Sequence, residues 1–314
     1  MRDVVWDMET GDPDDFLTLL LLLLGHPGVN LVAVTVTPGG ADQVAMVRWG
    51  LAQFGVDIPV GAFHDPATLE RTDQQQFDRI KDRVSGWHYK VFARPDRCYE
   101  ALPAWEVLRD HLGPETTLIT GAPLKNLGQL LDELSAAGET PDLGRWFCQG
   151  GFAGDNVVPP ERRLPKFEGK LTCPTYNLNG APKAALKAME TPLFSERRLV
   201  SKNVCHGVYY DRAMQDRLGA LLDEPDGYPL ERTRLAHRLI HKGMSAYLRK
   251  RADGKKFHDP LAACCALNPD IGVWAEVEMY REKGQWGANP APGSSTRIIT
   301  GYDHEAFVQT LLAR

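Results

Sequence analysis

The chain has 314 residues, of which 43% are hydrophobic, 25% charged and 9% aromatic, a composition typical of a globular protein with a large buried core. This composition excludes a disordered, collagen-like or disulfide-stapled chain. The 36 Lys and Arg residues against 41 Asp and Glu residues leave a formal charge of -5, which disfavours nucleic acid as a main partner.

Short β-branched runs alternate with longer helical stretches along the chain. Strands are expected at residues 4–7, 29–37, 116–120 and 145–149, and helices at residues 14–24, 41–54 and 124–133. This alternation predicts an α/β fold with a mostly parallel, open, Rossmann-like central sheet flanked by helices. From about residue 192 the chain turns more helical, and residues 230–247 form the clearest amphipathic stretch. No linker or repeat divides the sequence, so residues 1–314 are predicted to form a single domain.

The longest apolar run, residues 16–24, is shorter than the ~20 residues that a membrane-spanning helix needs. Its apolar residues surround every face, which predicts a helix buried on all sides. The N-terminal residues lack the apolar stretch and cleavage site of a secretory signal. Six cysteines without a CxxC pair, two of them adjacent, indicate reduced thiols and no zinc site. We therefore expect a cytoplasmic protein that does not associate with membranes.

Five carboxylates crowd into nine residues between the first predicted strand and the first predicted helix: Asp7, Glu9, Asp12, Asp14 and Asp15. Their mutual repulsion calls for a cation, and the hard cations Ca²⁺ and Mg²⁺ take oxygen ligands. Capping of the helix would need only one or two of these carboxylates. In open α/β sheets ligands bind beyond the carboxyl ends of the strands, so the cluster predicts a metal site at this edge.

Polar segments follow other predicted strands or begin predicted helices. Backbone carbonyls of residues 120–126 are candidates to coordinate the same cation, and residues 150–156 offer amide and carboxylate groups to a polar ligand. Residues 174–177 begin another predicted helix. Near the C-terminus, His258 and Asp259 begin a hydrophobic helix. Asp259 is a candidate metal ligand that is distant in sequence, and His258 is a candidate acid or base near neutral pH.

Taken in this order, these segments resemble the inosine-uridine-preferring nucleoside hydrolase family. The resemblance rests on four motifs: Asp7-Met8-Glu9-Thr10-Gly11 with Asp14-Asp15, Ala122-Pro123-Leu124-Lys125-Asn126, Gly150-Gly151 with Asn156 and Asn177, and His258-Asp259-Pro260-Leu261-Ala262. It implies the nucleoside hydrolase fold and a metal-dependent hydrolysis of the N-glycosidic bond of a nucleoside or nucleoside-like substrate, releasing base and ribose. It also implies a homodimer or homotetramer.

The resemblance further implies the role of each site residue. The metal, Ca²⁺ or alternatively Mg²⁺, would be held by Glu9, Asp15, the carbonyl of Lys125 and Asp259. Glu9 would also act as general base on water, and His258 would protonate the leaving base. Contacts to the ribose or to the metal ligands would come from Asp7, Asp14, Asn156 and Asn177.

Several residues depart from the family pattern. Glu9 stands where the family usually has Asp, and the loop to Asp14 is one residue longer. Gly40 replaces an Asn, and Thr175 replaces the Glu that usually precedes the sugar-binding Asn by two positions, which alters the expected ribose contacts.

The two long loops predicted at residues 66–97 and 157–172 are candidates for substrate contacts or plain surface excursions. In the first, the aromatic residues Trp87, His88 and Tyr89 are candidates to stack on a base. The second carries four basic residues, Arg162, Arg163, Lys166 and Lys170. One hypothesis is that they meet a phosphorylated or modified 5′ position. The interleaved Glu161 and Glu168 favour a solvated loop instead.

Two other functions remain open from the sequence. Residues 4–11 also resemble the first motif of DEDD-type exonucleases, but the spacing of His258 and Asp259 and the net charge do not fit such an enzyme. A ribose- or nucleoside-binding protein of the same fold, with lost or altered turnover, is the second alternative. It is motivated by Glu9, Gly40 and Thr175, and detection of sugar release separates it from the enzyme.

Overall fold

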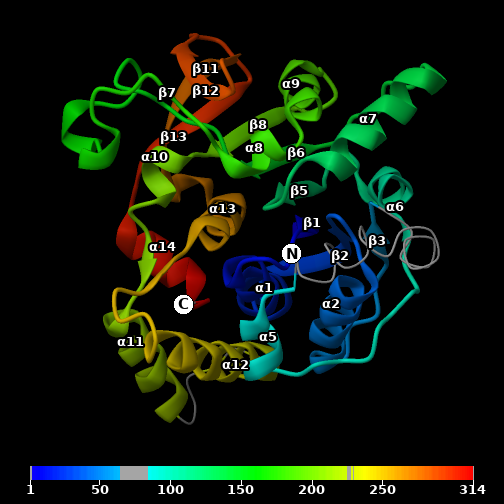
Figure 1. The fold of residues 1–314 in the computed structure, drawn as a ribbon, viewed down its shortest axis with the longest axis vertical. Helices are drawn as coiled ribbons and strands as arrows, with labels where there is room; N and C mark the ends of the chain where they lie inside the picture. Colours follow the sequence, from blue (N-terminus) through cyan, green and yellow to red (C-terminus); the bar gives the residue numbers. More distant parts are fainter. Residues whose placement is uncertain (1, 64–83, 225–227, 229, 314) are drawn as a thin grey trace.

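A computed structural model describes residues 2–63, 84–224, 228 and 230–313 (Figure 1). Its main sheet has eleven strands among these residues, in the order β4-β3-β2-β1-β5-β6-β8-β13-β11-β12-β7. They are β1 (Arg2–Met8), β2 (Val29–Val36), β3 (Val60–Ala62), β4 (Leu102–Pro103), β5 (Thr117–Thr120), β6 (Arg145–Gln149), β7 (Thr172–Cys173), β8 (Glu196–Val200), β11 (Gly272–Glu282), β12 (Gln285–Pro290) and β13 (Thr296–Tyr302). A separate antiparallel pair joins β9 (Tyr209–Tyr210) to β10 (Lys255–Lys256).

Helices precede, join or follow these strands. They are α1 (Pro13–Thr18), α2 (Ala41–Gln53), α5 (Gly86–Val91), α6 (Ala104–His111), α7 (Lys125–Ala137), α8 (Tyr176–Gly180), α9 (Pro182–Glu190), α10 (Lys202–Cys205), α11 (Arg212–Asp223), α12 (Glu231–Leu248), α13 (His258–Leu267) and α14 (His304–Leu311). Single turns of other helix types are the π-helical η1 (Leu19–Leu24) and the 3₁₀ turns η2 (Pro160–Arg162), η3 (Pro165–Phe167) and η4 (Pro269–Ile271). No helix in the described part of the chain is long and apolar enough to cross a membrane.

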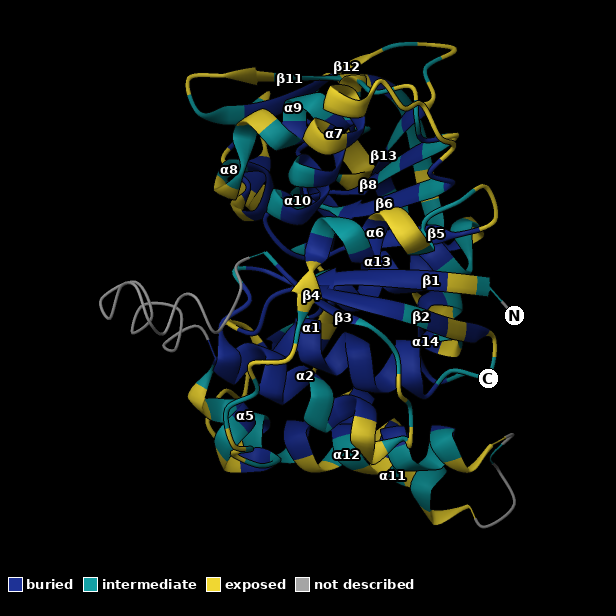
Figure 2. Cartoon of the chain, turned by 90° about the vertical axis from the view of Figure 1, so that its right-hand side faces the viewer, coloured by how far each residue is buried: buried dark blue, intermediate teal, exposed yellow. Residues whose placement is uncertain are grey.

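The predicted α/β architecture is confirmed. The strands from β4 to β13 in sheet order pair in parallel, and only β11, β12 and β7 add antiparallel pairs. Alternate residues of β1 enter different cores, with Trp6 packed on one face of the sheet and Val5 on the other. Figure 2 shows β1 and β2 buried along most of their lengths, as expected for strands covered by helices on both faces.

The segments η1 and α13 cover one face of the sheet, and α12 packs on the outside of η1. The other face is covered by α6, which contacts α7, and α7 in turn contacts α9. The leucines of η1 are at most 3% exposed, which confirms that this segment is buried on all sides. The predicted helical stretch over residues 14–24 is confirmed, although the α-helix α1 passes directly into the wider π-helical η1 at Leu19. Packing on every side rather than an amphipathic stripe shapes this segment.

The antiparallel end of the sheet was missed by the sequence analysis, which expected mainly helices there. β11 and β12 form a hairpin in which Glu282 pairs with Gln285. Its two turn residues, Lys283 and Gly284, have φ values of 49° and 79°. A two-residue turn of this kind prefers Asn-Gly or Asp-Gly, and Lys in the first position hides the signal.

The two predicted loops contain more structure than expected. Residues 64–83 of the first loop lie outside the described residues, but residues 86–91 form α5, so the loop prediction is wrong there. In the second loop, η2 and η3 alternate with extended backbone, and Val158 and Phe167 are buried. These two side chains anchor the second loop to the rest of the protein.

Candidate metal and nucleoside site

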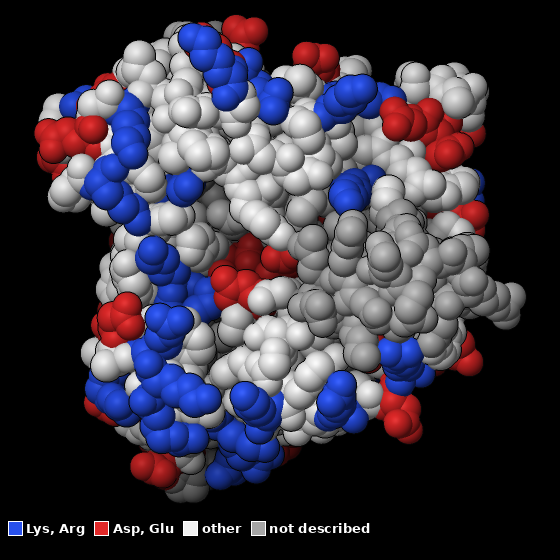
Figure 3. Space-filling model, in the orientation of Figure 1, with Lys and Arg blue, Asp and Glu red and all other residues white. Residues whose placement is uncertain are grey.

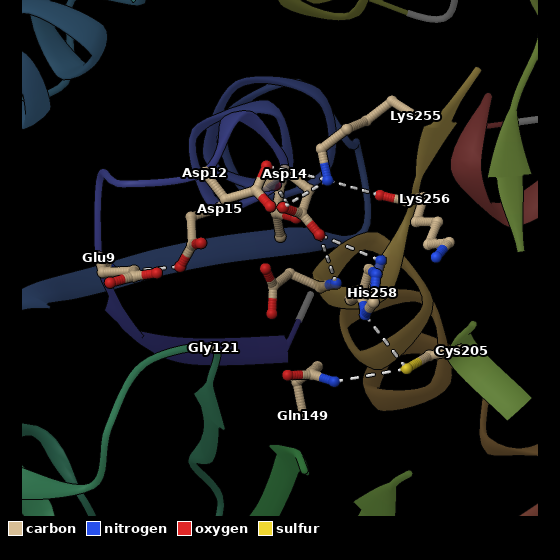
Figure 4. A network of polar contacts seen from close by, with 12 residues as sticks. Glu9, Asp12, Asp14, Asp15, Gly121, Gln149, Cys205, Lys255, Lys256 and His258 are labelled. Atoms are coloured by element: carbon tan, nitrogen blue, oxygen red, sulfur yellow. Dashed lines mark hydrogen bonds and ion pairs between the residues drawn. The ribbon is translucent and has the colours of Figure 1, made fainter. Parts of the chain in front are cut away.

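The loop after β1 meets the start of α13 at the carboxyl edge of the parallel strands. Asp14, in α1, makes the connection, because its Oδ2 accepts hydrogen bonds from the backbone N–H groups of His258 (3.1 Å) and Asp259 (3.4 Å) (Figure 4). The first amides of a helix lack partners within the helix, so the Asp14 carboxylate satisfies two of them in α13. The acidic loop and the His-Asp pair predicted from distant parts of the sequence thus form one site.

Three buried carboxylates converge at this point. One oxygen each from Asp14, Asp15 and Asp259 lies within 4.8 Å of the others. The Oδ1 of Asp15 accepts a hydrogen bond from the backbone N–H of Glu9 at 3.0 Å. The Oδ1 of Asp259 is buried and has no hydrogen-bond partner among the described residues. Buried anionic oxygens that lack partners are costly, so this oxygen set fits a hard divalent cation.

The charges of this cluster oppose one another. Burial and the negative charges of Asp259 and Glu9 raise the pKa of Asp15 well above its usual value. Burial, followed by the charge of Asp14, does the same to the pKa of Asp259. The raised pKa values of Asp15 and Asp259 mean that the other groups of the protein do not offset the negative charges of these two carboxylates when both are ionised.

Gly121, directly after β5, lets the backbone approach these carboxylates. A Cβ atom at this position would lie 2.8 Å from Asp259 Oδ1, 3.1 Å from Asp15 Oδ1 and 2.5 Å from the ring of Trp6. The Gly121 N–H donates to the carbonyl of Asp7 at 2.8 Å, which fixes the loop against the end of β1. Only glycine allows this contact without displacing the carboxylates.

The carboxylates form part of the wall of a cavity of about 320 Å³, a volume within the range of small-molecule sites. The cavity is lined by Glu9, Gly11, Asp12, Asp14, Asp15, Gly121, Gln149, Tyr176, Asn177, His258 and Asp259. Figure 3 shows the acidic atoms in a hollow of the molecular surface.

The sequence analysis missed a buried lysine at this site. Lys255 is 4% exposed, and its ammonium lies 3.0 Å from Asp14 Oδ1 and 2.9 Å from Asp12 Oδ1 (Figure 4). Burial alone would raise the pKa of Asp14, but Lys255 and His258 outweigh it and lower this pKa to about 2. Asp14 is therefore fully ionised and its charge is compensated within the protein.

Comparisons with known proteins identify the family of the chain. A model of the inosine-uridine preferring nucleoside hydrolase family matches residues 4–309. The chain belongs to this family. Its members are N-glycosyl hydrolases, so the chain is assigned to that class of enzyme, and the exonuclease alternative is wrong. A search of curated protein sequences gave no match.

Solved structures of the nucleoside hydrolase fold superpose over the whole chain. A plant nucleoside hydrolase shares 18% identity at a TM-score of 0.65, covering 100% of this chain and 99% of its own. A purine-preferring ribonucleoside hydrolase from Gardnerella vaginalis shares 14% identity at 0.65, covering 99% and 97%. An inosine-uridine preferring nucleoside hydrolase from Bacillus anthracis shares 18% identity at 0.61, covering 100% and 99%. At these identities the likeness establishes the fold.

His258 lies on one wall of this nucleoside hydrolase cavity. Its Nδ1 is 3.4 Å from the Sγ of Cys205, and its ring packs edge-on against His206 with 4.8 Å between centroids. Burial lowers the pKa of His258 to about 4. No hydrogen bond of its Nε2 occurs in the described part of the structure, which leaves this nitrogen available to a ligand.

α8 supplies the opposite wall. The Asn177 side-chain amide donates to the carbonyl of Gly121 at 2.8 Å and to the Oε1 of Gln149 at 2.8 Å, so it joins the ends of β5 and β6. The Tyr176 side chain, which the sequence analysis did not select, is 61% exposed, and its hydroxyl lies 3.5 Å from Glu9 Oε2. Neither Tyr176 nor Gln149 belongs to a sequence motif that indicates chemistry.

Asp7 supports the site from inside the protein and does not line the cavity. Its Oδ1 accepts hydrogen bonds from Asn126 Nδ2 at 2.6 Å and Thr35 Oγ1 at 2.8 Å. Burial raises the pKa of Asp7 to about 7, although both hydrogen bonds act in the opposite direction. The Oδ2 of Asp7 and the Oδ1 of Asn126 are buried and have no hydrogen-bond partner within the part of the chain that the structure describes.

Besides Asp7, four other predicted residues do not line the cavity. Asn156 is exposed, and its amide donates to the carbonyl of Ala288 at 2.8 Å, because the second loop carries it towards β12. The ammonium of Lys125 lies over the Phe63 ring. The backbone carbonyl of Lys125 stays a predicted metal ligand. The hydroxyl of Thr175 is buried, and no described residue forms a hydrogen bond with it. His88 is buried against Phe16, with 5.1 Å between ring centroids, so it packs in the core instead of stacking on a ligand.

Proposed function

We propose that this chain is a calcium-dependent nucleoside hydrolase that cleaves the N-glycosidic bond of a ribonucleoside and releases base and ribose. The observation that carries the proposal is the buried Oδ1 of Asp259, which has no hydrogen-bond partner in the described part of the chain and lies among the other carboxylates of the cavity wall. Ca²⁺ accepts six to eight oxygen ligands in flexible geometry, whereas Mg²⁺ keeps most of its water. A site rich in protein oxygens therefore favours Ca²⁺ over Mg²⁺.

We assign Asp15 and Asp259 as the main ligands, with Glu9 and the Lys125 carbonyl as further ligands. Asp14 plays a different part, because its oxygens already contact Lys255 and the backbone of α13. When bound, the cation supplies a Lewis acid for water and for the ribose 2′ and 3′ hydroxyls.

The side chains around the cation supply the rest of the chemistry. Glu9 accepts a proton from the attacking water, and the Tyr176 hydroxyl beside Glu9 Oε2 orients this carboxylate. The negative charge of the cluster stabilises the positive charge that develops on the sugar as the glycosidic bond breaks. Asn177 positions the sugar, and the Nε2 of His258 contacts the departing base.

The proposal is tested by reducing-sugar release from a panel of purine and pyrimidine ribonucleosides, with Ca²⁺ and with a chelator. We expect release that stops with the chelator and falls at least about 100-fold in Glu9→Gln, because a general base contributes 10²- to 10⁴-fold. Asp132→Asn is the matched control, since this exposed carboxylate pairs with Lys187 away from the cavity. Folding of each variant is checked by circular dichroism.

Two outcomes would contradict the proposal. Sugar release that is unaffected by the chelator would exclude the cation. Saturable nucleoside binding without release, in folded and calcium-loaded protein, would favour the alternative of a binding protein with this fold.

We extend the proposal to a cytoplasmic homodimer or homotetramer. All six cysteines are free, with Cys98 partly exposed and the others buried. Free thiols are compatible with a reducing compartment. Light scattering on the purified protein measures the oligomeric state.

A further inference from the structure

Three lysines, Lys166, Lys202 and Lys256, lie beside the cavity, and we name them the lysine cluster. The ammonium of Lys166 is 2.6 Å from the Nδ1 of His206. The ring of His206 packs against that of His258, which lines the cavity. Figure 3 shows Lys and Arg side chains along one side of the acidic hollow.

The other two lysines are held beside the same cavity by different elements. Lys202 begins α10, and its ammonium donates at 2.9 Å to the carbonyl of Pro174, two residues before the cavity residue Tyr176. Lys256 follows Lys255 in β10, and side chains alternate along a strand. Lys255 therefore reaches Asp12 and Asp14, while the side chain of Lys256 points away from these carboxylates (Figure 4).

Among the described residues, the three ammonium groups of the lysine cluster are not paired with carboxylates. In the part of the chain that the structure describes, no carboxylate forms an ion pair with any of its three members, whereas Lys187 pairs with Asp132 at 2.7 Å. Burial, the like charge of Lys256 and that of Lys202 lower the pKa of Lys166. An anion bound among the three ammonium groups would relieve this repulsion.

The remaining basic residues of the second loop do not share this position. Arg163 pairs with Asp155 at 3.3 Å, and Arg162 packs against Gly301 on β13. Lys166 and Lys170 both lie over the Phe167 ring, 4.9 Å and 5.7 Å from its centroid, but Lys166 also reaches the Nδ1 of His206, which packs against the cavity residue His258. The lysine cluster therefore contains one of the four basic residues of the second loop, Lys166, together with Lys202 from α10 and Lys256 from β10.

We infer that the substrate of this site is a nucleoside 5′-monophosphate, whose phosphate binds to Lys166, Lys202 and Lys256. This inference rests on the proposed function, in which the 2′ and 3′ hydroxyls face the carboxylates. With the 2′ and 3′ hydroxyls at the acidic wall, the 5′ carbon extends away from it. A phosphate on the 5′ oxygen would therefore lie away from the carboxylates. Water adds to C1′ as the C1′–N bond breaks, the proton passes to the base, and ribose 5-phosphate is the second product.

The first experiment measures binding, which does not depend on turnover. Isothermal titration compares ribose 5-phosphate, ribose and inorganic phosphate with the calcium-loaded protein. We expect ribose 5-phosphate to bind at least about tenfold more tightly than ribose or inorganic phosphate, since it engages both the cation site and the lysine cluster. Equal affinity for ribose and ribose 5-phosphate would overturn the inference.

The second experiment compares variants. Lys166→Ala and Lys256→Ala are each expected to weaken ribose 5-phosphate binding about tenfold and to lower the ratio of kcat/KM for the monophosphate over the nucleoside by a similar factor. Lys166→Arg retains the charge and is expected to lose less. Lys183→Ala is the control, because Lys183 is exposed on α9 and lines a different cavity.

The outcomes separate this inference from the proposed function. Hydrolysis of nucleosides at a kcat/KM equal to or above that of their monophosphates overturns the inference and leaves the hydrolase proposal intact. Absence of hydrolysis of either substrate contradicts the hydrolase proposal, while the binding experiment still decides whether a phosphate is bound. An equal loss in Lys183→Ala and Lys166→Ala would show a net-charge effect and would also overturn the inference.

Discussion

Asp14 and Asp259 face the same cavity and are buried to nearly the same extent, with 2% and 4% exposure. Their hydrogen-bond partners and the direction of their pKa shifts nevertheless differ. Asp14 contacts a buried ammonium and two backbone amides, and its pKa is lowered to about 2. Asp259 has an oxygen for which residues 2–63, 84–224, 228 and 230–313 provide no hydrogen-bond partner, and its pKa is raised well above the usual value. Burial alone therefore does not decide the state of a carboxylate in this site.

The difference divides the acidic cluster into two regions with separate tasks. The Asp14 region, with Lys255 and the start of α13, is complete within the protein and ties together segments 241 residues apart. The Asp259 region, with Asp15 and Gly121, is the part of the cluster to which we assign the proposed cation. Variants in the first region are expected to affect stability, and variants in the second to affect cation binding.

The largest expected effect is on Lys255 in the Asp14 region. Lys255→Met removes the buried ammonium and leaves Asp14 uncompensated, which is expected to lower the free energy of unfolding by about 3–5 kcal/mol. Urea denaturation measures this change. Lys256→Met, one residue away and without a carboxylate partner in the described structure, is expected to change it by less than about 0.5 kcal/mol.

A double variant sharpens the same prediction. Asp14→Asn added to Lys255→Met removes the uncompensated charge and is expected to restore part of the lost stability. Equal destabilisation by Lys255→Met and Lys256→Met would show that Lys255 is not specifically required.

The Asp259 region is tested by adding and removing the cation. Ca²⁺ at about 100 times its dissociation constant is expected to stabilise the protein by about 2.7 kcal/mol, and a chelator to reverse this. In Asp259→Asn the stabilisation by Ca²⁺ is expected to vanish, while the metal-free protein changes by less than about 1 kcal/mol because like-charge repulsion is also relieved. Calcium titrations followed by thermal unfolding check both statements. Full retention of the calcium effect in Asp259→Asn would contradict the ligand assignment.

A smaller effect is expected where the backbone presses against the Asp259 region. In Gly121→Ala the added Cβ would meet Asp259 Oδ1 and Trp6, at a cost of about 1–3 kcal/mol, together with weaker calcium binding. Gly113→Ala is the control, since a Cβ there meets nothing within 4 Å. The two variants are compared by thermal unfolding with and without Ca²⁺, and equal behaviour would contradict the close approach at Gly121.

Part of the acidic site, including Asp15 and Asp259, could be predicted from the sequence, whereas other parts could not. The crowding of acids after a strand and the His-Asp pair before an apolar helix indicated Asp15 and Asp259, because parallel strands bring their carboxyl ends to one edge. Lys255 was missed because two adjacent lysines are typical of a solvated surface, and only the pairing of β10 with β9 directs one of them inwards. Asn156 was placed in the site because sequence spacing does not reveal that its loop packs against β12.

The smallest expected effect concerns the edge of the Asp259 region. Tyr176→Phe removes the long hydrogen bond to Glu9 Oε2, and the side chain is largely exposed, so the free energy of unfolding is expected to stay within about 0.5 kcal/mol of the parent. A neutral hydrogen bond contributes about 0.5–1.5 kcal/mol, which corresponds to a two- to tenfold lower kcat/KM. Because Glu9 is assigned as the base, the loss should appear mainly in kcat. A loss confined to KM would instead place Tyr176 in substrate binding and separate it from Glu9.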